Sequence, residues 1–194
     1  MLETYKVITV THKGISLKEI GDFVVRSLNE ESLDDRLREI KVQFELEELY
    51  YLATCNRVLY FFVSERALDA NFAARFLLAV NPHLSNDMLN RLDESALLLE
   101  GMDALNHFFE VAASIDSLVV GERQILGQVR AAYEQCHSWG LTGDQLRLAI
   151  QQAVVAAKGI YSRTRIGEKP VSIVSLAIQQ MMRTKLPADA RILI

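Results

Sequence analysis

The sequence is poor in cysteine, in proline and in long apolar runs, and each shortage excludes a class of protein. Its 194 residues include only two cysteines, too few for the disulfide framework of a small secreted domain, so a reducing, cytoplasmic location is expected. Three prolines and a hydrophobic share of 50% are typical of a globular chain and not of a disordered one. No window approaches about 18 uninterrupted apolar residues, so no membrane span is expected.

Positive charge is also scarce. Lysine and arginine number 21 against 25 acidic residues, giving a formal charge of −4, so composition gives no global indication of a nucleic-acid partner. Residues 1–10 carry charges inside their apolar run and lack a small-residue cleavage site. This pattern is typical of a first strand and not of a signal peptide.

Residues 1–100 are predicted to form an α+β catalytic subdomain. β-branched, aromatic and apolar runs predict strands at 7–10, 49–53, 58–63 and 96–99, and helical spacing predicts helices at 17–28, at 67–80 and in a short segment from 85. Ser16 and Glu19 fit a capping box at the first helix, whereas the charged run 29–48 has no predicted element. The order β-α-β-β-α-β predicts an antiparallel sheet sandwich with helices on one face.

From residue 102 onward the pattern is almost entirely helical. Helical spacing predicts helices at 102–113, about 117–139, 143–163 and 172–185. Residues 101–168 are therefore expected to form a helical part that follows the sheet and completes the substrate pocket. Residues 169–194 are expected to supply a helix and a first strand that lead into a further domain.

The segment Thr54-Cys-Asn-Arg57, between two predicted strands, is the first candidate for chemistry. A thiol becomes a good nucleophile where a positive charge or a backbone dipole lowers its pKa. Residues two apart in an extended strand share a face, so Arg57 is expected beside Cys55, where it would steady a thiolate or clamp a carboxylate. Thr54 and Asn56 would hold a polar substrate. The alternative is a half-buried structural cysteine beside a solvated arginine.

A row of uncharged polar side chains is the second candidate. On a helical wheel, Ser117, Gly121, Gln124 and Gln128 fall in one sector beside an apolar stripe. Hydroxyl and amide groups in a row suit a polar, amino-acid-like ligand, and the alternative is a solvated helix edge. If Gly121 marks the start of the helix, Ser117 leaves this face.

His107 lies among large apolar residues on a predicted helix, where it is either a general acid or base or a core histidine. Cys136 shares its wheel angle with Leu118 and is expected in the core. No cluster of cysteine, histidine and carboxylate residues has the spacing of metal ligands, and no glycine-rich phosphate loop is present. The sequence therefore predicts no metal and no cofactor site in this chain.

Together these segments resemble the N-terminal half of glutamyl-tRNA reductase. The matching stretches are Thr54-Cys-Asn-Arg57, His107-Phe-Phe-Glu-Val-Ala112, the block 116–129, Ala156 to Lys158 and Arg163-Thr-Arg-Ile-Gly167. The block 116–129 is long and specific, and its position after 54–57 argues against coincidence. The resemblance covers nearly the whole chain, although residues 13–50 and 64–100 carry little of it.

The resemblance implies an NADPH-dependent oxidoreductase for the first step of tetrapyrrole (porphyrin) biosynthesis from glutamate. The Cys55 thiolate would attack the ester of glutamyl-tRNA, and NADPH would reduce the resulting thioester to glutamate-1-semialdehyde. Arg57 would hold the substrate carboxylate, and His107 would protonate the leaving group or tune the thiol. The glutamate pocket would be lined by Thr54, Asn56, Ser117, Glu122, Arg123, Gln124 and Gln128, with Glu122 at the substrate ammonium.

The resemblance also implies a homodimer of the full-length enzyme and a downstream aminomutase as a partner. A dinucleotide site needs a glycine turn at a helix N-terminus, which this sequence lacks, so this chain is expected to reach only the thioester or its hydrolysis. Arg123 stands where the family commonly has proline, and residues 14–19 depart from the family pattern. The alternatives are a catalytically degenerate reductase-like binding or regulatory module, and an unrelated cysteine thioesterase or redox protein.

Overall fold

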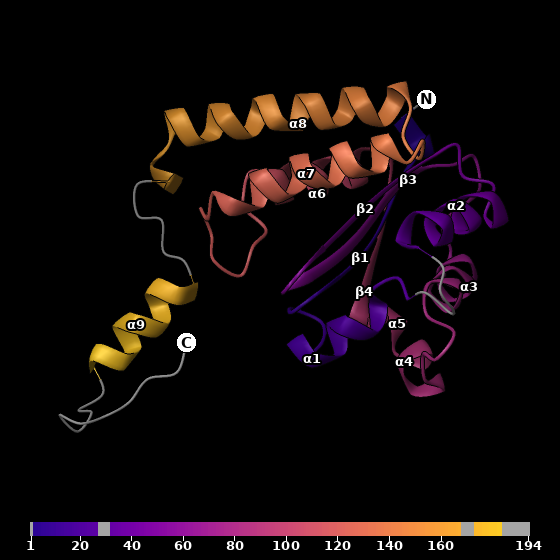
Figure 1. Cartoon of the computed structure of the whole chain (residues 1–194), viewed down its shortest axis with the longest axis horizontal. Coiled ribbons are helices and arrows are strands. Elements are labelled where there is room, and N and C mark those ends of the chain that lie inside the picture. Colours follow the sequence, from indigo (N-terminus) through magenta and orange to yellow (C-terminus); the bar gives the residue numbers. More distant parts are fainter. Residues whose placement is uncertain (1, 27–31, 168–172, 184–194) are drawn as a thin grey trace.

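The computed structural model describes residues 2–26, 32–167 and 173–183, and its centre is a four-stranded antiparallel sheet (Figure 1). The strands are β1 (Tyr5–Thr11), β2 (Glu48–Thr54), β3 (Arg57–Val63) and β4 (Ala96–Glu100). Their order is β2-β3-β1-β4, so β1 pairs with β3 on one side and with β4 on the other. The four predicted strands and the α+β class are confirmed, with each strand slightly longer than predicted.

Helices surround the sheet. They are α1 (Leu17–Ile20), α2 (Leu33–Gln43), α3 (Ala70–Val80), α4 (Asn86–Asn90), α5 (Leu92–Ser95), α6 (Gly101–Ala112), α7 (Gln124–Ser138), α8 (Asp144–Arg163) and α9 (Ile173–Arg183), with 3-10 turns η1 (Leu2–Thr4), η2 (Gly21–Phe23) and η3 (Arg165–Gly167). The capping box of Ser16 and Glu19 is confirmed, but α1 ends at Ile20 and not at 28. Helix α2 lies in the charged run 29–48, where the sequence predicts no element. The predicted strand at the end of the chain lies outside the described residues.

The sheet is buried on both faces by aromatic packing. Phe61 of β3 stacks on Phe108 of α6 with ring centroids 4.8 Å apart. The next residue, Phe62, points to the opposite face and stacks on Phe76 of α3 at 5.7 Å. Helix α3, from residues 1–100, therefore covers one face, and α6, from the helical part that follows, covers the other. Strands β2 and β3 show little alternation of polar and apolar residues because helices bury most of both faces, whereas the edge strand β4 is partly exposed.

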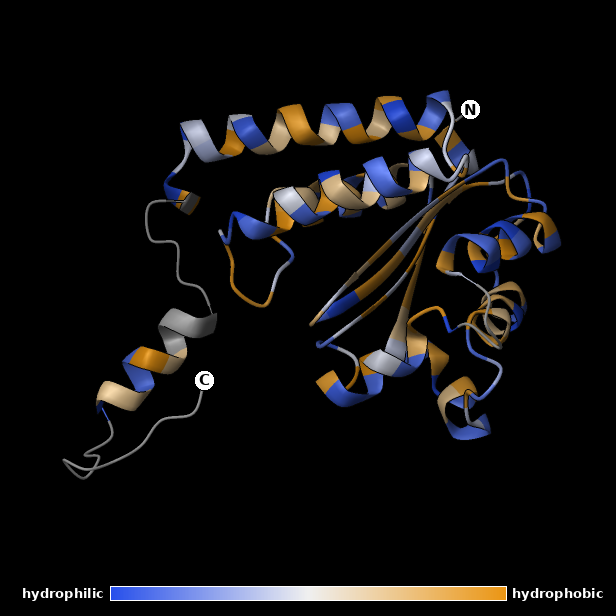
Figure 2. Cartoon of the chain, viewed as in Figure 1, coloured by the Kyte–Doolittle hydropathy of each residue, from blue (hydrophilic) through white to orange (hydrophobic). Residues whose placement is uncertain are grey.

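Helices α6, α7 and α8 form the layer that matters for the site. Helix α7 runs antiparallel to β2, since the Tyr51 N–H donates to Cys136 Sγ at 3.4 Å, whereas two residues earlier in β2 the Leu49 N–H donates to the carbonyl of Leu141, after the end of α7, at 2.9 Å. Helix α8 runs back along α7, and Figure 2 shows hydrophobic and hydrophilic residues mixed along it. One hydrophobic core contains residues of the sheet and of these helices, so the division at residue 100 stays a prediction. Within the described residues, no helix is both long and apolar enough to cross a membrane.

Glu48 of β2 closes the N-terminal turn of α8. Its carboxylate accepts hydrogen bonds from the backbone N–H groups of Gly143 (2.7 Å), Gln145 (3.0 Å) and Leu146 (2.9 Å). These groups have no acceptor within the helix, and the negative charge complements the positive end of the helix dipole. Gly143 permits the approach, because a Cβ atom there would lie 2.7 Å from Glu48 Oε1.

Replacing Glu48 by glutamine should lower the free energy of unfolding by about 1–3 kcal/mol, because the neutral amide has one accepting oxygen and no charge. Urea unfolding followed by circular dichroism measures this change. Glu47→Gln is the matched control, since Glu47 is exposed and contacts the helix only through Gln145 Nε2 at 3.3 Å. An equal loss in both variants would contradict the capping role.

Candidate active site

Cys55 lies on the two-residue turn that joins β2 to β3. Thr54 pairs with Arg57, so Cys55 and Asn56 alone form the turn, and the Cys55 side chain is exposed. The Thr54 hydroxyl donates to Asn56 Oδ1 at 2.9 Å, and the His12 N–H donates to the Asn56 carbonyl at 3.2 Å. The prediction that Cys55 and Arg57 share a face is wrong, because the chain reverses direction between them. The half-buried structural cysteine is equally contradicted by the exposed thiol.

Arg57 points inward, where the carboxylate of Asp116 holds it. Arg57 Nη2 donates to Asp116 Oδ2 at 2.7 Å and to the Asp116 carbonyl at 2.5 Å, and the two side chains are only 3% and 10% exposed. Lys13, just after β1, pairs with the other oxygen of the same carboxylate. Asp116, in the loop before α7, therefore contacts residues of β3 and of the segment just after β1.

His107 of α6 completes this cluster. Its Nε2 lies 3.2 Å from Arg57 Nη1, which can only donate, so Nε2 accepts and the ring proton is on Nδ1. The same Nδ1 lies 3.8 Å from Asp116 Oδ2. Burial, and then the charge of Arg57, lower the pKa of His107 from 6.5 to about 4, so the ring is neutral at pH 7. Burial alone would raise the pKa of Asp116, but the hydrogen bonds from Lys13 and Arg57 lower it to about 2.

A pocket of about 370 Å³ opens beside the cluster. Lys13, His107 and Asp116 line one part of it, and the other polar lining residues are Thr9, Thr11, Glu94, Ser95 and Glu110. Sequence reasoning missed Lys13 and Asp116. Asp116 opens the block 116–129, but nothing local distinguishes it from a solvated loop carboxylate.

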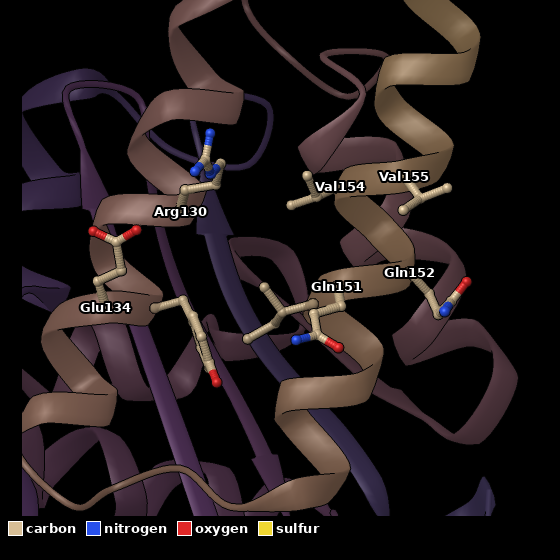
Figure 3. A pocket seen from close by; sticks show the side chains of 8 residues that line it. Arg130, Glu134, Gln151, Gln152, Val154 and Val155 are labelled. Atoms are coloured by element: carbon tan, nitrogen blue, oxygen red, sulfur yellow. The ribbon is translucent and has the colours of Figure 1, made fainter.

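A second pocket, of about 470 Å³, lies between α7 and α8 (Figure 3). Among the side chains that line it are Arg130 and Glu134 of α7 and Gln151, Gln152, Val154 and Val155 of α8. None of the predicted site residues lines this pocket, so it is not a candidate for the active site.

The remaining predicted residues lie in or after the loop 113–123. Helix α7 begins at Gln124, so Ser117 and Gly121 leave the helical face of Gln124 and Gln128. Both glutamines are exposed and lie four residues apart on one side of α7. Ser117 and Glu122 are half-buried.

Gly121 fixes the position of this loop. Its φ is +86°, and a Cβ atom there would lie 2.0 Å from the carbonyl oxygen of Ile166. Its N–H donates to the Ser114 carbonyl at 3.0 Å. The glycine therefore lets the loop close on itself and approach the backbone of η3, which no other residue allows.

The other cysteine and the acidic groups offer no second centre. Cys136 is 1% exposed, as expected for a core residue, and burial raises the pKa of its thiol to about 11. In the part of the chain that the structure describes, no group of three or more histidine, cysteine, aspartate or glutamate residues could hold a metal ion.

The sequence and the fold both match known proteins. A family model described as "Glutamyl-tRNAGlu reductase, N-terminal domain" matches residues 8–164. The glutamyl-tRNA reductase of Campylobacter hominis is 34% identical over 178 residues, covering 90% of this chain and 39% of that protein. That of Sulfolobus acidocaldarius is 30% identical over 189 residues, covering 93% of this chain and 40% of that protein.

A solved structure, "Glutamyl-tRNA Reductase from Methanopyrus kandleri", matches the fold with a TM-score of 0.69 at 28% identity. The match covers 93% of this chain and 40% of that one. The chain thus spans about two-fifths of the length of the relatives it matches.

Substituting alanine at Gly121 should lower the free energy of unfolding by at least about 1–2 kcal/mol, because both the positive φ and the Ile166 backbone oppose a side chain. Gly127→Ala is the matched control, since Gly127 is an exposed residue of α7 where an added Cβ atom would meet no neighbouring group within 4 Å. There alanine should raise stability by up to about 1 kcal/mol. Thermal melts of both variants test the sign of each stability change. A Gly121→Ala variant as stable as the parent would contradict the close approach of Gly121 to the Ile166 carbonyl.

The stability of the fold should fall as the pH drops from about 6.5 toward 4. Unfolded His107 takes up a proton near its ordinary pKa of 6.5, whereas the folded residue resists protonation until about 4. The loss is on the order of 3 kcal/mol at most. Asp116, with a pKa of about 2, contributes mainly below this window. Urea unfolding at a series of pH values measures how the free energy of unfolding changes with pH. His107→Gln should flatten this dependence. An unchanged dependence would mean that other groups cause it.

Proposed function

This chain belongs to the glutamyl-tRNA reductase family, and from that membership we propose that Cys55 forms a thioester with the glutamyl group of glutamyl-tRNA. The observation that carries the proposal is the exposed Cys55 thiol on a short, hydrogen-bonded turn. Arg57, at the other side of the same turn, is anchored in a buried cluster of charged side chains. Such a turn presents a nucleophile to a large substrate.

In the proposed step, the Cys55 thiolate attacks the carbonyl carbon of the aminoacyl ester. A sulfur–carbon bond forms, the bond between that carbon and the ribose oxygen breaks, and the leaving oxygen takes a proton. At pH 7 the neutral His107 has no imidazolium proton to give, and its Nε2 accepts from Arg57. We therefore assign His107 the task of holding Arg57, and water at the exposed turn supplies the proton.

Arg57 is proposed to bind the substrate carboxylate while it keeps its ion pair with Asp116, so the substrate does not displace Asp116. Arg57 and Lys13 carry two positive charges against the single negative charge of Asp116, while His107 is neutral. The contacting groups therefore have one uncompensated positive charge, which a substrate carboxylate would balance. The Lys13 side chain is 62% exposed and faces the pocket, so it is accessible to the substrate. The proposed lining of the glutamate site remains Thr54, Asn56, Ser117, Glu122, Arg123, Gln124 and Gln128.

Reduction of the thioester to glutamate-1-semialdehyde is proposed to use NADPH in the full-length enzyme, as a step toward tetrapyrroles. The described residues contain no glycine turn at a helix N-terminus that fits a dinucleotide, so no residue here is assigned to hydride transfer. Without a hydride, water would hydrolyse the thioester to glutamate and free thiol. The homodimer and the aminomutase partner are likewise proposals about the full-length enzyme.

Acid-quenched mixtures of this protein with radiolabelled glutamyl-tRNA should contain a covalent glutamyl adduct that hydroxylamine removes. Cys55→Ser should abolish the hydroxylamine-sensitive label, because the thiol is the attacking group. Cys136→Ala is the matched control and should keep the label, since that thiol is buried in the core.

Label that persists in Cys55→Ser would overturn the assignment of the nucleophile. Absence of label in the parent protein, with glutamyl-tRNA still bound, would favour a reductase-like binding module without catalysis. Labelling that is lost equally in both cysteine variants would indicate damage to the fold.

A further inference from the structure

The end of the domain that carries Cys55 also carries a basic patch, defined as Arg123, Lys158 and Arg163. All three side chains are exposed. Residues 145–167 contain Arg147, Lys158, Arg163 and Arg165 and no acidic residue, in a chain whose net charge is −4. A local excess of positive charge on a negative protein is typical of a surface that contacts a polyanion.

Arg123 and Lys158 border a pocket of about 330 Å³ together with Leu126, Tyr161 and Ser162. The Arg123 guanidinium lies over the Tyr161 ring, with Cζ 5.8 Å from the ring centroid. Tyr161 is half-buried and packs against the hydrophobic core, so the ring is held in place. Aromatic rings and guanidinium planes stack on unpaired bases, and lysine and arginine contact phosphates. The pocket combines both kinds of group.

The helix dipole does not account for the patch. A cation in the last turn of a helix is stabilised by the negative end of the dipole, which explains Arg163 at the end of α8. Lys158 lies more than one turn earlier, and Arg123 belongs to the segment before α7, so the dipole explains neither. Glu122, which precedes Arg123, is half-buried.

Antiparallel packing brings the patch to the same end of the domain as Cys55. Helix α7 runs antiparallel to β2, because Leu49 contacts Leu141 and Tyr51 contacts Cys136, so the first turn of α7 lies toward the Cys55 turn. Helix α8 reverses again, since Glu48 holds its first turn at the far end and Arg123 meets Tyr161 near its last. Figure 1 shows the C-terminal end of α8 on the same side of the molecule as the loop before α7.

We propose that the basic patch binds the single-stranded 3′ end of the RNA whose terminal ribose carries the glutamyl ester. A base near that end stacks on the Arg123–Tyr161 pair, and Lys158 and Arg163 contact the adjoining phosphates. The identity of the RNA rests on the function proposed above. The binding step itself needs no chemistry at Cys55, so the two proposals can fail separately.

The test is the affinity of this protein for glutamate tRNA without its amino acid, measured by fluorescence anisotropy over a range of salt concentrations. Lys158→Glu should weaken binding by roughly tenfold and lower the slope of log K against log salt by about one. Arg147→Glu is the matched control: it makes the same charge change on the same helix, but at the end where Arg147 pairs with Asp144 at 2.8 Å. It should leave affinity close to that of the parent protein.

A second pair of variants tests stacking. Tyr161→Leu should weaken binding by roughly fivefold to a hundredfold, whereas Tyr161→Phe, which keeps the ring, should bind like the parent. Both should be compared on an RNA minihelix with and without its single-stranded 3′ nucleotides, and thermal melts should confirm that each variant is folded. Removing those nucleotides should erase the difference between the two variants.

Equal losses in Lys158→Glu and Arg147→Glu would overturn the proposal, because binding would then follow net charge and not this patch. Thioester formation at Cys55 with tRNA affinity indifferent to Lys158 would also overturn it, while the proposed function would stand. Patch-dependent RNA binding without any thioester would support the patch and count against the chemistry.

Discussion

The buried ion pair between Arg57 and Asp116 is the interaction on which the arrangement of the site depends. A guanidinium that is 3% exposed has no water to solvate it, so it requires a carboxylate and hydrogen-bond acceptors. Asp116 supplies both a side-chain oxygen and its backbone carbonyl, and His107 supplies a ring nitrogen. The loop 113–123, helix α6 and strand β3 are thereby held in one geometry. Removing Asp116 would leave the buried Arg57 guanidinium without a carboxylate, whereas removing Arg57 would leave Asp116 paired with Lys13 alone.

This arrangement separates the reactive atom from the charges that support it. Cys55 is exposed on a turn whose two flanking residues, Thr54 and Arg57, are paired in the sheet. The turn also accepts a hydrogen bond from the backbone of His12, next to Lys13. The thiol can therefore meet a macromolecular substrate, while Arg57, two residues away, is buried. Gly121 also helps to position Asp116, because it lets the loop that contains Asp116 lie against η3.

The sequence is sufficient to predict what local patterns determine. Aromatic, β-branched and apolar runs locate the four strands, and the capping box of Ser16 and Glu19 locates the start of α1. Helix α2 escapes prediction because its apolar face is narrow, with only Leu37 and Ile40 buried within it. The Cys55–Asn56 turn escapes because it lacks the glycine that usually signals a two-residue hairpin loop, so the segment is easily taken as extended.

The partner of Arg57 escapes prediction for a different reason. Arg57 and Asp116 are 59 residues apart, and no period or propensity links residues at that separation. The resemblance marks the block 116–129 as a whole but gives its first residue no role. The start of α7 is misplaced because Ser117 and Gly121 happen to fit the helical wheel, whereas Gly121 has a φ of +86° and lies in the loop. Tertiary contacts therefore determine both the partner of Arg57 and the start of α7.

The position of the basic patch follows from a contact at the opposite end of the domain. Glu48 binds the first backbone N–H groups of α8, which fixes where the helix begins relative to β2. An α-helix advances about 1.5 Å per residue, so the 20 residues of α8 carry the chain roughly 30 Å back along α7 before the helix ends at Arg163 (Figure 1). The last turns of α8 therefore lie beside the start of α7, where Arg123 meets Tyr161, at the end of α7 that lies toward Cys55. The length of α8 thus sets the distance between its cap at Glu48 and the cations near its C-terminus. A change in that length or in the cap would move the basic patch relative to the Cys55 thiol without changing the residues of the patch or the thiol itself.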